Sequence, residues 1–281
     1  MAREEGDFVI PFKGRSENHH GSQNKPECFL PLVLIPTYNT GRKLAETICS
    51  ARSVWTPVWV VVDGSTDNSA EILESLSRND PGLRVIVLAP NRGKGAAIRQ
   101  GVEEAFRAGF SHVLTMDADG QHPAQSIPEF MACARSHPDT LILGLPVFDL
   151  SAPSLRVQGR KLSNWCANLE TLWAGIGDSL FGFRVYPIGP LRAAFKKSPG
   201  MQGFDFDPEA SVRMAWAGTP IINLTVPVTY FSPSEGGVSH FKYFRDNVLL
   251  TGMHIRLIFG FLARLPVLLW RRVHSTLPPQ K

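Results

Sequence analysis

The sequence predicts an α/β protein with a mostly parallel sheet flanked by helices and an amphipathic helical tail at the C-terminus. Two observations lead to this prediction. Apolar runs bounded by turn residues occur at 29–36, 58–62, 83–88 and 112–116, with a fifth at 141–145 and a further one at 221–228. Between the first four runs lie helical patterns at 43–52, around Ile72, Leu73 and Leu76, and at 96–108. Strands and helices that alternate at this spacing form a parallel sheet with right-handed crossovers.

Composition and charge limit the class of protein. The chain has 281 residues, 43% of them hydrophobic, which suits one large α/β domain or one domain plus a tail. A formal charge of +4 and a pI near 9.0 are too mild to indicate nucleic-acid binding. The four cysteines are widely spaced and show neither metal pairing nor a disulfide framework. The N-terminus lacks a secretory signal pattern, so we expect a cytoplasmic protein.

The first three strands each end in a polar turn. The run at 29–36 leads to Thr37, Tyr38 and Asn39, and the run at 58–62 leads to Asp63. The run at 83–88 is followed by a glycine turn at 91–95, where backbone amides at a helix start could approach a phosphate and Lys94 would add a positive charge. Because ligands bind beyond the carboxyl ends of parallel strands, these turns are expected to converge on one sheet edge.

The fourth strand ends in the stretch MDADGQHP, residues 116–123. Asp117 and Asp119, with the Gln121 carbonyl, could hold Mg²⁺ or Mn²⁺, which favour oxygen ligands and leave positions for substrate phosphates. The alternative is an Asp/Gly turn that caps the next helix. His122 and Pro123 are interpreted as the start of that helix only.

Four motifs in register carry a resemblance to a known family: PTYN at 36–39, VVDGSTDNS at 61–69, NRGKGAAIRQG at 91–101 and DADGQHP at 117–123. They resemble the family 2 glycosyltransferases of the GT-A fold, in particular the polyprenyl-phosphate sugar transferases of the dolichol-phosphate mannosyltransferase type. The resemblance covers roughly residues 29–238. It implies a Rossmann-like GT-A domain, predicted over residues 28–240, and a hexosyltransferase of the cell envelope.

The resemblance also implies roles on the donor side. A nucleotide-diphosphate sugar would be the donor, and a divalent cation would stabilise the charge on its leaving group, so Asp119 is expected to be essential for catalysis. The implied nucleotide-binding residues are Pro36, Tyr38, Asp63, Lys94 and Asp117, and the implied metal ligands are Asp117, Asp119 and Gln121.

The predicted acceptor-binding residues are Arg160, Ser163, Arg184 and His240. The first two lie at a spacing similar to the acceptor-phosphate segment of the family, although a solvated helix face is an equal alternative. Arg184 lies in a segment, 177–187, that resembles the family's strand near the donor sugar. His240 ends a glycine loop and is expected to bind an acceptor phosphate or to act as acid or base, the alternative being a structural histidine.

Among Asp205, Asp207 and Glu209, Asp207 is the residue predicted to act as general base or to bind a sugar hydroxyl. It lies in GFDFDPEAS, residues 203–211, and inverting relatives that glycosylate hydroxyls place an acid in a comparable region. The alternative is structural, because acids favour helix N-termini.

The two ends of the chain differ in character. Residues 1–27 are polar and predict a flexible arm. Residues 241–281 are basic and apolar, with Asp246 as their only acid. Arg256, Arg264 and Pro266 interrupt the apolar runs, so we expect a basic amphipathic helix that lies on an anionic membrane surface and does not span it. The alternative is a helix packed on the domain.

These observations predict an inverting, metal-dependent glycosyltransferase at the cytoplasmic membrane face, with a lipid-linked acceptor, first of all a polyprenyl phosphate. A second hypothesis is transfer to a hydroxyl of a glycolipid or another membrane lipid with Asp207 as base. The altered glycine loop before His240 and a missing arginine after Gly144 keep it open. Two hypotheses of a different class are a catalytically silent nucleotide-sugar-binding or membrane scaffold protein and a nucleotidyltransferase.

Overall fold

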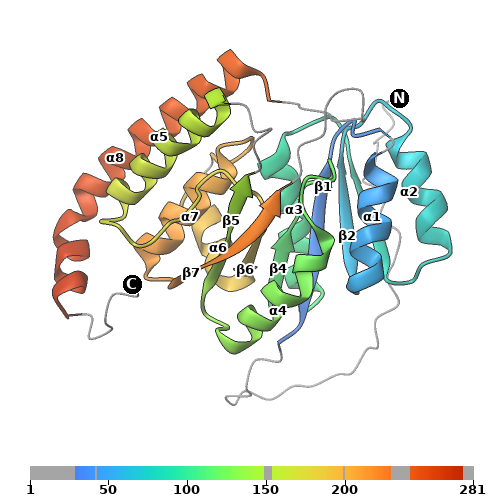
Figure 1. Cartoon of the computed structure of the whole chain (residues 1–281), viewed down its shortest axis with the longest axis horizontal. Helices are drawn as coiled ribbons and strands as arrows, with labels where there is room; N and C mark the ends of the chain where they lie inside the picture. Colours follow the sequence, from blue (N-terminus) through green and yellow to red (C-terminus); the bar gives the residue numbers. More distant parts are fainter. Residues whose placement is uncertain (1–28, 42, 149–153, 199, 229–240, 275–281) are drawn as a thin grey trace, which may run out of the picture.

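A seven-stranded, mostly parallel sheet forms the centre of the computed structural model (Figure 1), as the sequence predicts. The structure describes residues 29–41, 43–148, 154–198, 200–228 and 241–274. The strand order is β3-β2-β1-β4-β6-β5-β7, and β6 runs antiparallel to both of its neighbours. The strands are β1 (Pro31–Thr37), β2 (Val58–Asp63), β3 (Leu83–Leu88), β4 (His112–Thr115), β5 (Leu141–Phe148), β6 (Arg184–Pro187) and β7 (Ile221–Val228).

Helices cover both faces of the sheet. One face packs against α1, α2 and α4, and the other against α3, α6 and α7, while α8 lies beside α5 and α7. The helices are α1 (Lys43–Val54), α2 (Ser69–Arg78), α3 (Lys94–Arg107), α4 (Ile127–Ser136), α5 (Ser154–Glu170), α6 (Ile188–Lys196), α7 (Phe206–Ala217) and α8 (Tyr243–His274), with a 3-10 turn, η1 (Ala124–Ser126), before α4.

The alternation of side chains along the strands explains this layering. Leu34 of β1 and Val61 of β2 point to the α3 side, whereas Val33 and Val60 point to the α1 side, and all four are fully buried. Gly101 brings α3 close to the sheet, because a Cβ atom there would lie 2.5 Å from a methyl carbon of Leu34. Because β1 and β2 are covered by helices on both faces, their side chains have to be apolar at successive positions and not only at alternate ones.

The C-terminal helix α8 is amphipathic and continuous over 32 residues. One of its faces packs on the domain through Leu250, Met253, Leu257 and Phe261. The helix continues through Pro266. Within the described residues, α8 is the helix long and apolar enough to cross a membrane by length and composition, with 22% of its most apolar window buried. Packing on the domain, which the sequence left open for this helix, holds for one of its faces.

The arm at residues 1–27, His240 and the end of the tail lie outside the described residues. The division of the chain at residue 240 stays a prediction, although the buried face of α8 belongs to the same hydrophobic cluster as α3, α6 and α7.

Candidate active site

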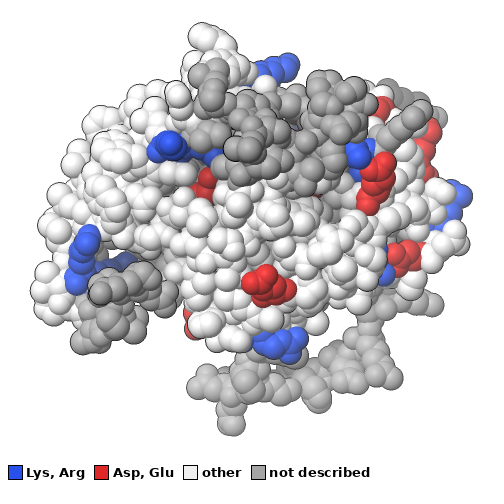
Figure 2. Space-filling view, viewed as in Figure 1, with Lys and Arg blue, Asp and Glu red and all other residues white. Residues whose placement is uncertain are grey.

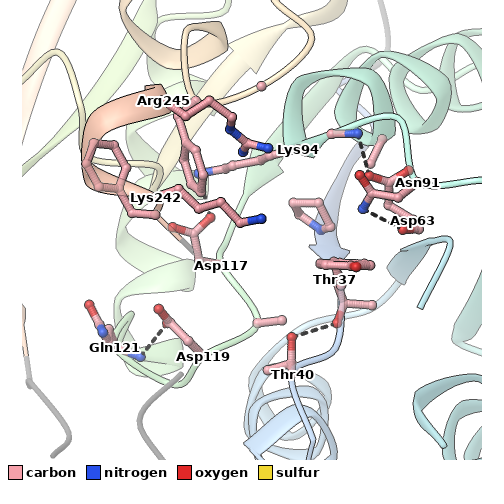
Figure 3. Close-up of a pocket in the computed structure, with 18 residues that line it drawn as sticks. Thr37, Thr40, Asp63, Asn91, Lys94, Asp117, Asp119, Gln121, Lys242 and Arg245 are labelled. Atoms are coloured by element: carbon pink, nitrogen blue, oxygen red, sulfur yellow. Dashed lines mark hydrogen bonds and ion pairs between the residues drawn. The ribbon is translucent and has the colours of Figure 1, made fainter. Parts of the chain in front are cut away.

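A cleft of about 360 Å³ lies at the carboxyl ends of β1, β2 and β4 (Figure 3). This is where an open α/β sheet binds ligands, and the volume suits a small-molecule site. Its polar lining residues come from five parts of the chain. They are Thr37, Tyr38 and Thr40 at and after the end of β1, Asp63 at the end of β2, Asn91 and Lys94 after β3, Asp117, Asp119 and Gln121 after β4, and Lys242 and Arg245 at the start of α8. Pro36 also lines the cleft.

The DADGQ turn is fixed by its own hydrogen bonds. The backbone amide of Gln121 donates to Oδ1 of Asp119 at 3.0 Å, and Gly120 has a φ of +78°, which glycine adopts without strain. The hydroxyl of Thr47 on α1 donates to the carbonyl of Ala118 at 3.1 Å. Both acids consequently face the cleft from a turn that is held to the rest of the domain.

His122 has a larger role than the start of a helix. Its Nδ1 accepts the backbone amide of Asp117 at 3.0 Å, and its ring packs edge-on against Phe181 and Phe183. Burial lowers the pKa of His122 to about 4. The ring is therefore neutral at pH 7 and carries its proton on Nε2, which lies 3.7 Å from Oδ2 of Asp117. His122 orients the first acid of the turn.

Lys94 joins two acids that are far apart in the sequence. Its Nζ lies 2.7 Å from Oδ1 of Asp117 and 3.0 Å from Oδ2 of Asp207. Burial disfavours the charged form of each group, yet the ion pairs outweigh it, raising the pKa of Lys94 and lowering that of Asp117. Gly182 leaves room for this pair, because a Cβ atom there would lie 2.7 Å from Nζ of Lys94.

Asp119 titrates differently from its neighbour. Burial, and next the negative charge of Asp117, raise the pKa of Asp119 to about 6.

The described residues contain no group of three or more His, Cys, Asp and Glu side chains placed to hold a metal ion. Two carboxylates and the Gln121 side chain, all lining one open cleft, still fit a hard divalent cation that completes its shell with phosphate oxygens. The donor set therefore suits Mg²⁺ or Mn²⁺.

Asp63 organises the glycine turn that precedes α3. Its carboxylate oxygens accept the backbone amides of Arg92 at 2.9 Å and Gly93 at 2.7 Å. Burial raises the pKa of Asp63, although these hydrogen bonds partly offset it. The backbone amides of Arg92 and Gly93, which belong to the glycine turn predicted to approach a phosphate, therefore donate to Asp63 instead. Gly93 adopts a φ of +99°, which permits the turn.

The predicted acceptor residues occupy different surroundings. Nη1 of Arg160 lies 2.9 Å from Oδ1 of Asp178, and Ser163 is buried on α5, where it contacts Ser179 and His254. Arg184 is fully buried and donates to the carbonyl of Asp207 and the hydroxyl of Ser211, both at 2.6 Å. None of these three residues, all within the described part of the chain, lines the cleft.

Asp207 is also buried, with 3% of its surface exposed. Its carboxylate is shared between Lys94 and, at 3.5 Å, the hydroxyl of Tyr186. Its position in the first turn of α7 agrees with a structural role, because acids stabilise helix N-termini.

Sequence reasoning missed the contribution of α8 to the cleft. Lys242 and Arg245 were assigned to a membrane-binding tail, yet both line the cleft with the acidic pair. Figure 3 shows Lys242 and Asp117 on one side of the cleft and Asp63 and Asn91 on the other. The available signal was the pair of cations, Lys242 and Arg245, that directly follows the glycine loop at 232–240.

Comparison with known proteins agrees with this geometry. The model of the family described as Glycosyl transferase family 2 matches residues 32–186. The chain is 28% identical over 219 residues to the undecaprenyl-phosphate mannosyltransferase of Micrococcus luteus, which covers 73% of this chain and 85% of the relative. It is 28% identical over 242 residues to the polyprenol monophosphomannose synthase of Mycolicibacterium smegmatis, covering 79% and 86%.

A solved structure supports the fold. Glucosyl-3-phosphoglycerate synthase from Mycobacterium tuberculosis, in complex with Mn²⁺, UDP-glucose and phosphoglyceric acid, superposes with a TM-score of 0.58 at 13% identity, over 83% of this chain and 79% of that one. The predicted GT-A fold and the predicted enzyme class are confirmed. The chain belongs to the family 2 glycosyltransferases.

Proposed function

We propose that this glycosyltransferase transfers a sugar from a nucleotide-diphosphate sugar to a polyprenyl phosphate at the cytoplasmic face of a membrane. The observation that carries the proposal is a single cleft that joins the acidic turn after β4 to cations at the start of an amphipathic helix. The two curated relatives, named for undecaprenyl phosphate and polyprenol, support this choice of acceptor.

The donor would bind on the side of the cleft formed by β1 and β2. Pro36, Tyr38 and Asp63 line that side, where they can surround a base and ribose. Lys94 is held by Asp117 and Asp207, so its charge is fixed beside the acidic turn. These residues orient the donor, and their positions do not select between UDP and GDP.

Asp117, Asp119 and Gln121 would hold the divalent cation. When bound, Mg²⁺ or Mn²⁺ supplies positive charge that stabilises the diphosphate leaving group. Metal binding at this site should depend on pH, because Asp119, with a pKa of about 6, must be ionised to serve as a ligand. The structural relative with Mn²⁺ and UDP-glucose supports the choice of metal class.

The reaction we propose needs no general base. A phosphate oxygen of the acceptor attacks the anomeric carbon, the bond from that carbon to the donor diphosphate breaks, and the diphosphate leaves with the electron pair. Attack on the face opposite to the leaving group inverts the anomeric configuration. A lipid phosphate is ionised at neutral pH, whereas a hydroxyl would have to lose a proton. Asp207 is buried and paired with Lys94, and we propose that it positions Lys94.

The membrane contact would be made by the exposed faces of α5 and α8. Phe244, Val248, Phe259 and Leu262 are exposed and recur at helical spacing on the side of α8 opposite to its packed face. Figure 2 shows few charged side chains over the part of the surface where α5 and α8 lie. Trp165 on α5 and Trp270 on α8 are also exposed. Since the other face of α8 packs on the domain, we propose that the helix lies in the membrane surface.

Transfer to a defined acceptor tests the proposal. The full chain would be incubated with a panel of radiolabelled UDP and GDP sugars, Mn²⁺ or Mg²⁺, and either undecaprenyl phosphate or undecaprenol in mixed micelles. We expect label in the organic phase with the phosphate, and none with the alcohol or with a chelator. Label with the alcohol would instead support hydroxyl transfer. Saturable donor binding without label in either case would support a catalytically silent protein.

A further inference from the structure

Lys242, directly before α8, and Arg245, in its first turn, place two cations where the cleft meets an apolar surface. Lys242 and Arg245 line the cleft together with Asp117 and Asp119. Between them in the sequence lie Tyr243 and Phe244, with 64% and 83% of their surface exposed. A polar recess and an exposed apolar face therefore meet within one helical turn.

Two other cations near the cleft have carboxylate partners. Lys94 is paired with Asp117 and Asp207, and Arg160 with Asp178. Within the described part of the chain, no carboxylate lies within ion-pair distance of the Lys242 ammonium. Arg245 contacts Asp246 through Nε at 2.9 Å, which leaves its two terminal nitrogens for another anion.

Asp246 fixes the backbone from which these cations extend. It is buried, and its Oδ2 accepts the backbone amide of Lys242 while its Oδ1 accepts from Arg245. Phe241, which precedes Lys242, packs its ring against Phe204 at 5.5 Å between centroids. The turn is thereby held at the cleft, although both basic side chains are themselves exposed.

A ligand that fits this junction must carry an anion attached directly to a hydrocarbon chain. We propose that Lys242 and Arg245 bind the phosphate of the lipid acceptor, and that the exposed side of α8 from Phe244 onward contacts the first part of its hydrocarbon chain. This inference rests on the proposed function, and it assigns the acceptor phosphate to α8 in place of Arg160 and Ser163. The donor diphosphate is the other phosphate source that could use the same cations.

Binding measurements distinguish the acceptor phosphate from the donor diphosphate as the ligand of these cations, and they do not require catalytic turnover. Isothermal titration of the full chain with farnesyl phosphate, below its micelle concentration, gives acceptor affinity, and titration with UDP and GDP in the presence of Mn²⁺ gives donor affinity. Farnesol and inorganic phosphate are the probes for the chain and the anion alone. Lys242→Gln and Arg245→Gln remove the cations, Lys242→Arg keeps the charge, and Arg272→Gln removes a cation at the far end of the same helix.

We expect each Gln variant at 242 and 245 to weaken farnesyl phosphate binding by about tenfold, since a hydrogen bond to a charged group is lost. Farnesol and nucleotide binding should be unchanged, Lys242→Arg should retain affinity, and Arg272→Gln should behave as the wild type. Weaker nucleotide binding with unchanged farnesyl phosphate binding would assign the cations to the donor and overturn the inference. Equal losses for farnesol and farnesyl phosphate would overturn it as well.

Failure of the phosphate site and failure of the proposed function can be told apart. If the wild type transfers no sugar but binds farnesyl phosphate through Lys242 and Arg245, the proposed activity fails and the phosphate site stands. If transfer to undecaprenyl phosphate occurs and both Gln variants keep the wild-type KM for that acceptor, the activity stands and the site assignment fails.

Discussion

The two sides of the cleft are built in different ways. On the side formed by the strand ends, Asp63 is the last residue of β2, and Asp117 and Asp119 lie two and four residues after the end of β4, so the end of each strand determines where its acid lies. On the side formed by the helices, contacts join distant segments, such as Lys94 with Asp207 at the cleft and Ser163 with His254 behind it, which are 113 and 91 residues apart. Local motifs therefore determine the first side, whereas helix packing determines the second.

The largest expected effect is at the acidic turn after β4. Asp119→Asn should lower metal-dependent transfer by roughly a thousandfold, because a metal ligand worth several kcal/mol to the leaving group is lost. The measurement is kcat/KM for the donor at saturating Mn²⁺. The exposed Asp139, changed to Asn, is the matched control and should keep wild-type activity. Full activity of Asp119→Asn in the presence of a chelator would refute the metal assignment.

A second substitution acts where the two sides meet. Gly182→Ala places a Cβ atom 2.7 Å from Nζ of Lys94, so the flexible lysine should move away from Asp117. We expect kcat to fall by about tenfold or more while the protein stays folded, as a displaced charge costs a few kcal/mol. Gly189→Ala on α6, where an added methyl meets nothing within 4 Å, is the control. Equal kcat values for both variants would show that the Lys94–Asp117 pair is not needed.

A third prediction concerns the exposed face of α8. Phe259→Ser should lower partitioning to anionic vesicles by about tenfold, since burial of a Phe side chain in lipid contributes about 2 kcal/mol. Vesicle flotation measures the bound fraction. Phe106→Ser removes an exposed aromatic ring from α3 and should leave flotation unchanged. Point substitutions are preferred to truncation after Tyr243, because truncation would remove the buried face of α8. Equal flotation of the two variants would contradict the proposed membrane face.

The smallest effect concerns the buried contact between α5 and α8. Glu170 is fully buried, and its Oε1 accepts from Nδ1 of His254 at 2.8 Å. Burial raises the pKa of Glu170, although the hydrogen bond from His254 partly offsets it. The folded state therefore retains a proton that the unfolded state has lost, and the free energy of unfolding should fall as pH rises from the unfolded pKa to the folded pKa.

Glu170→Gln should remove this dependence, which amounts to at most about 1.4 kcal/mol per pH unit. Urea unfolding at a series of pH values measures it, with exposed Glu129→Gln as the control. A slope that is the same in Glu170→Gln and the wild type would show that Glu170 ionises equally in both states.

The acidic turn and the sheet were predictable from local patterns. Apolar runs specify strands that are buried on both faces, and a polar residue that ends such a run has to lie at the sheet edge, as Asp63 and Asp117 do. The antiparallel direction of β6 was not predictable in this way, because strand direction depends on the connection between elements and leaves no mark on the strand itself.

The sequence by itself determined the family, the GT-A fold and the acids of the DADGQ turn, because each depends on residues close together in the chain. Only the tertiary structure decided that Arg184 is a buried residue that supports Asp207, and that Lys242 and Arg245 line the cleft. The sequence of a helix does not distinguish a charged residue that faces solvent from one that faces lipid or a ligand. Its role is decided by the elements that pack around it, and for α8 these are α5 and α7.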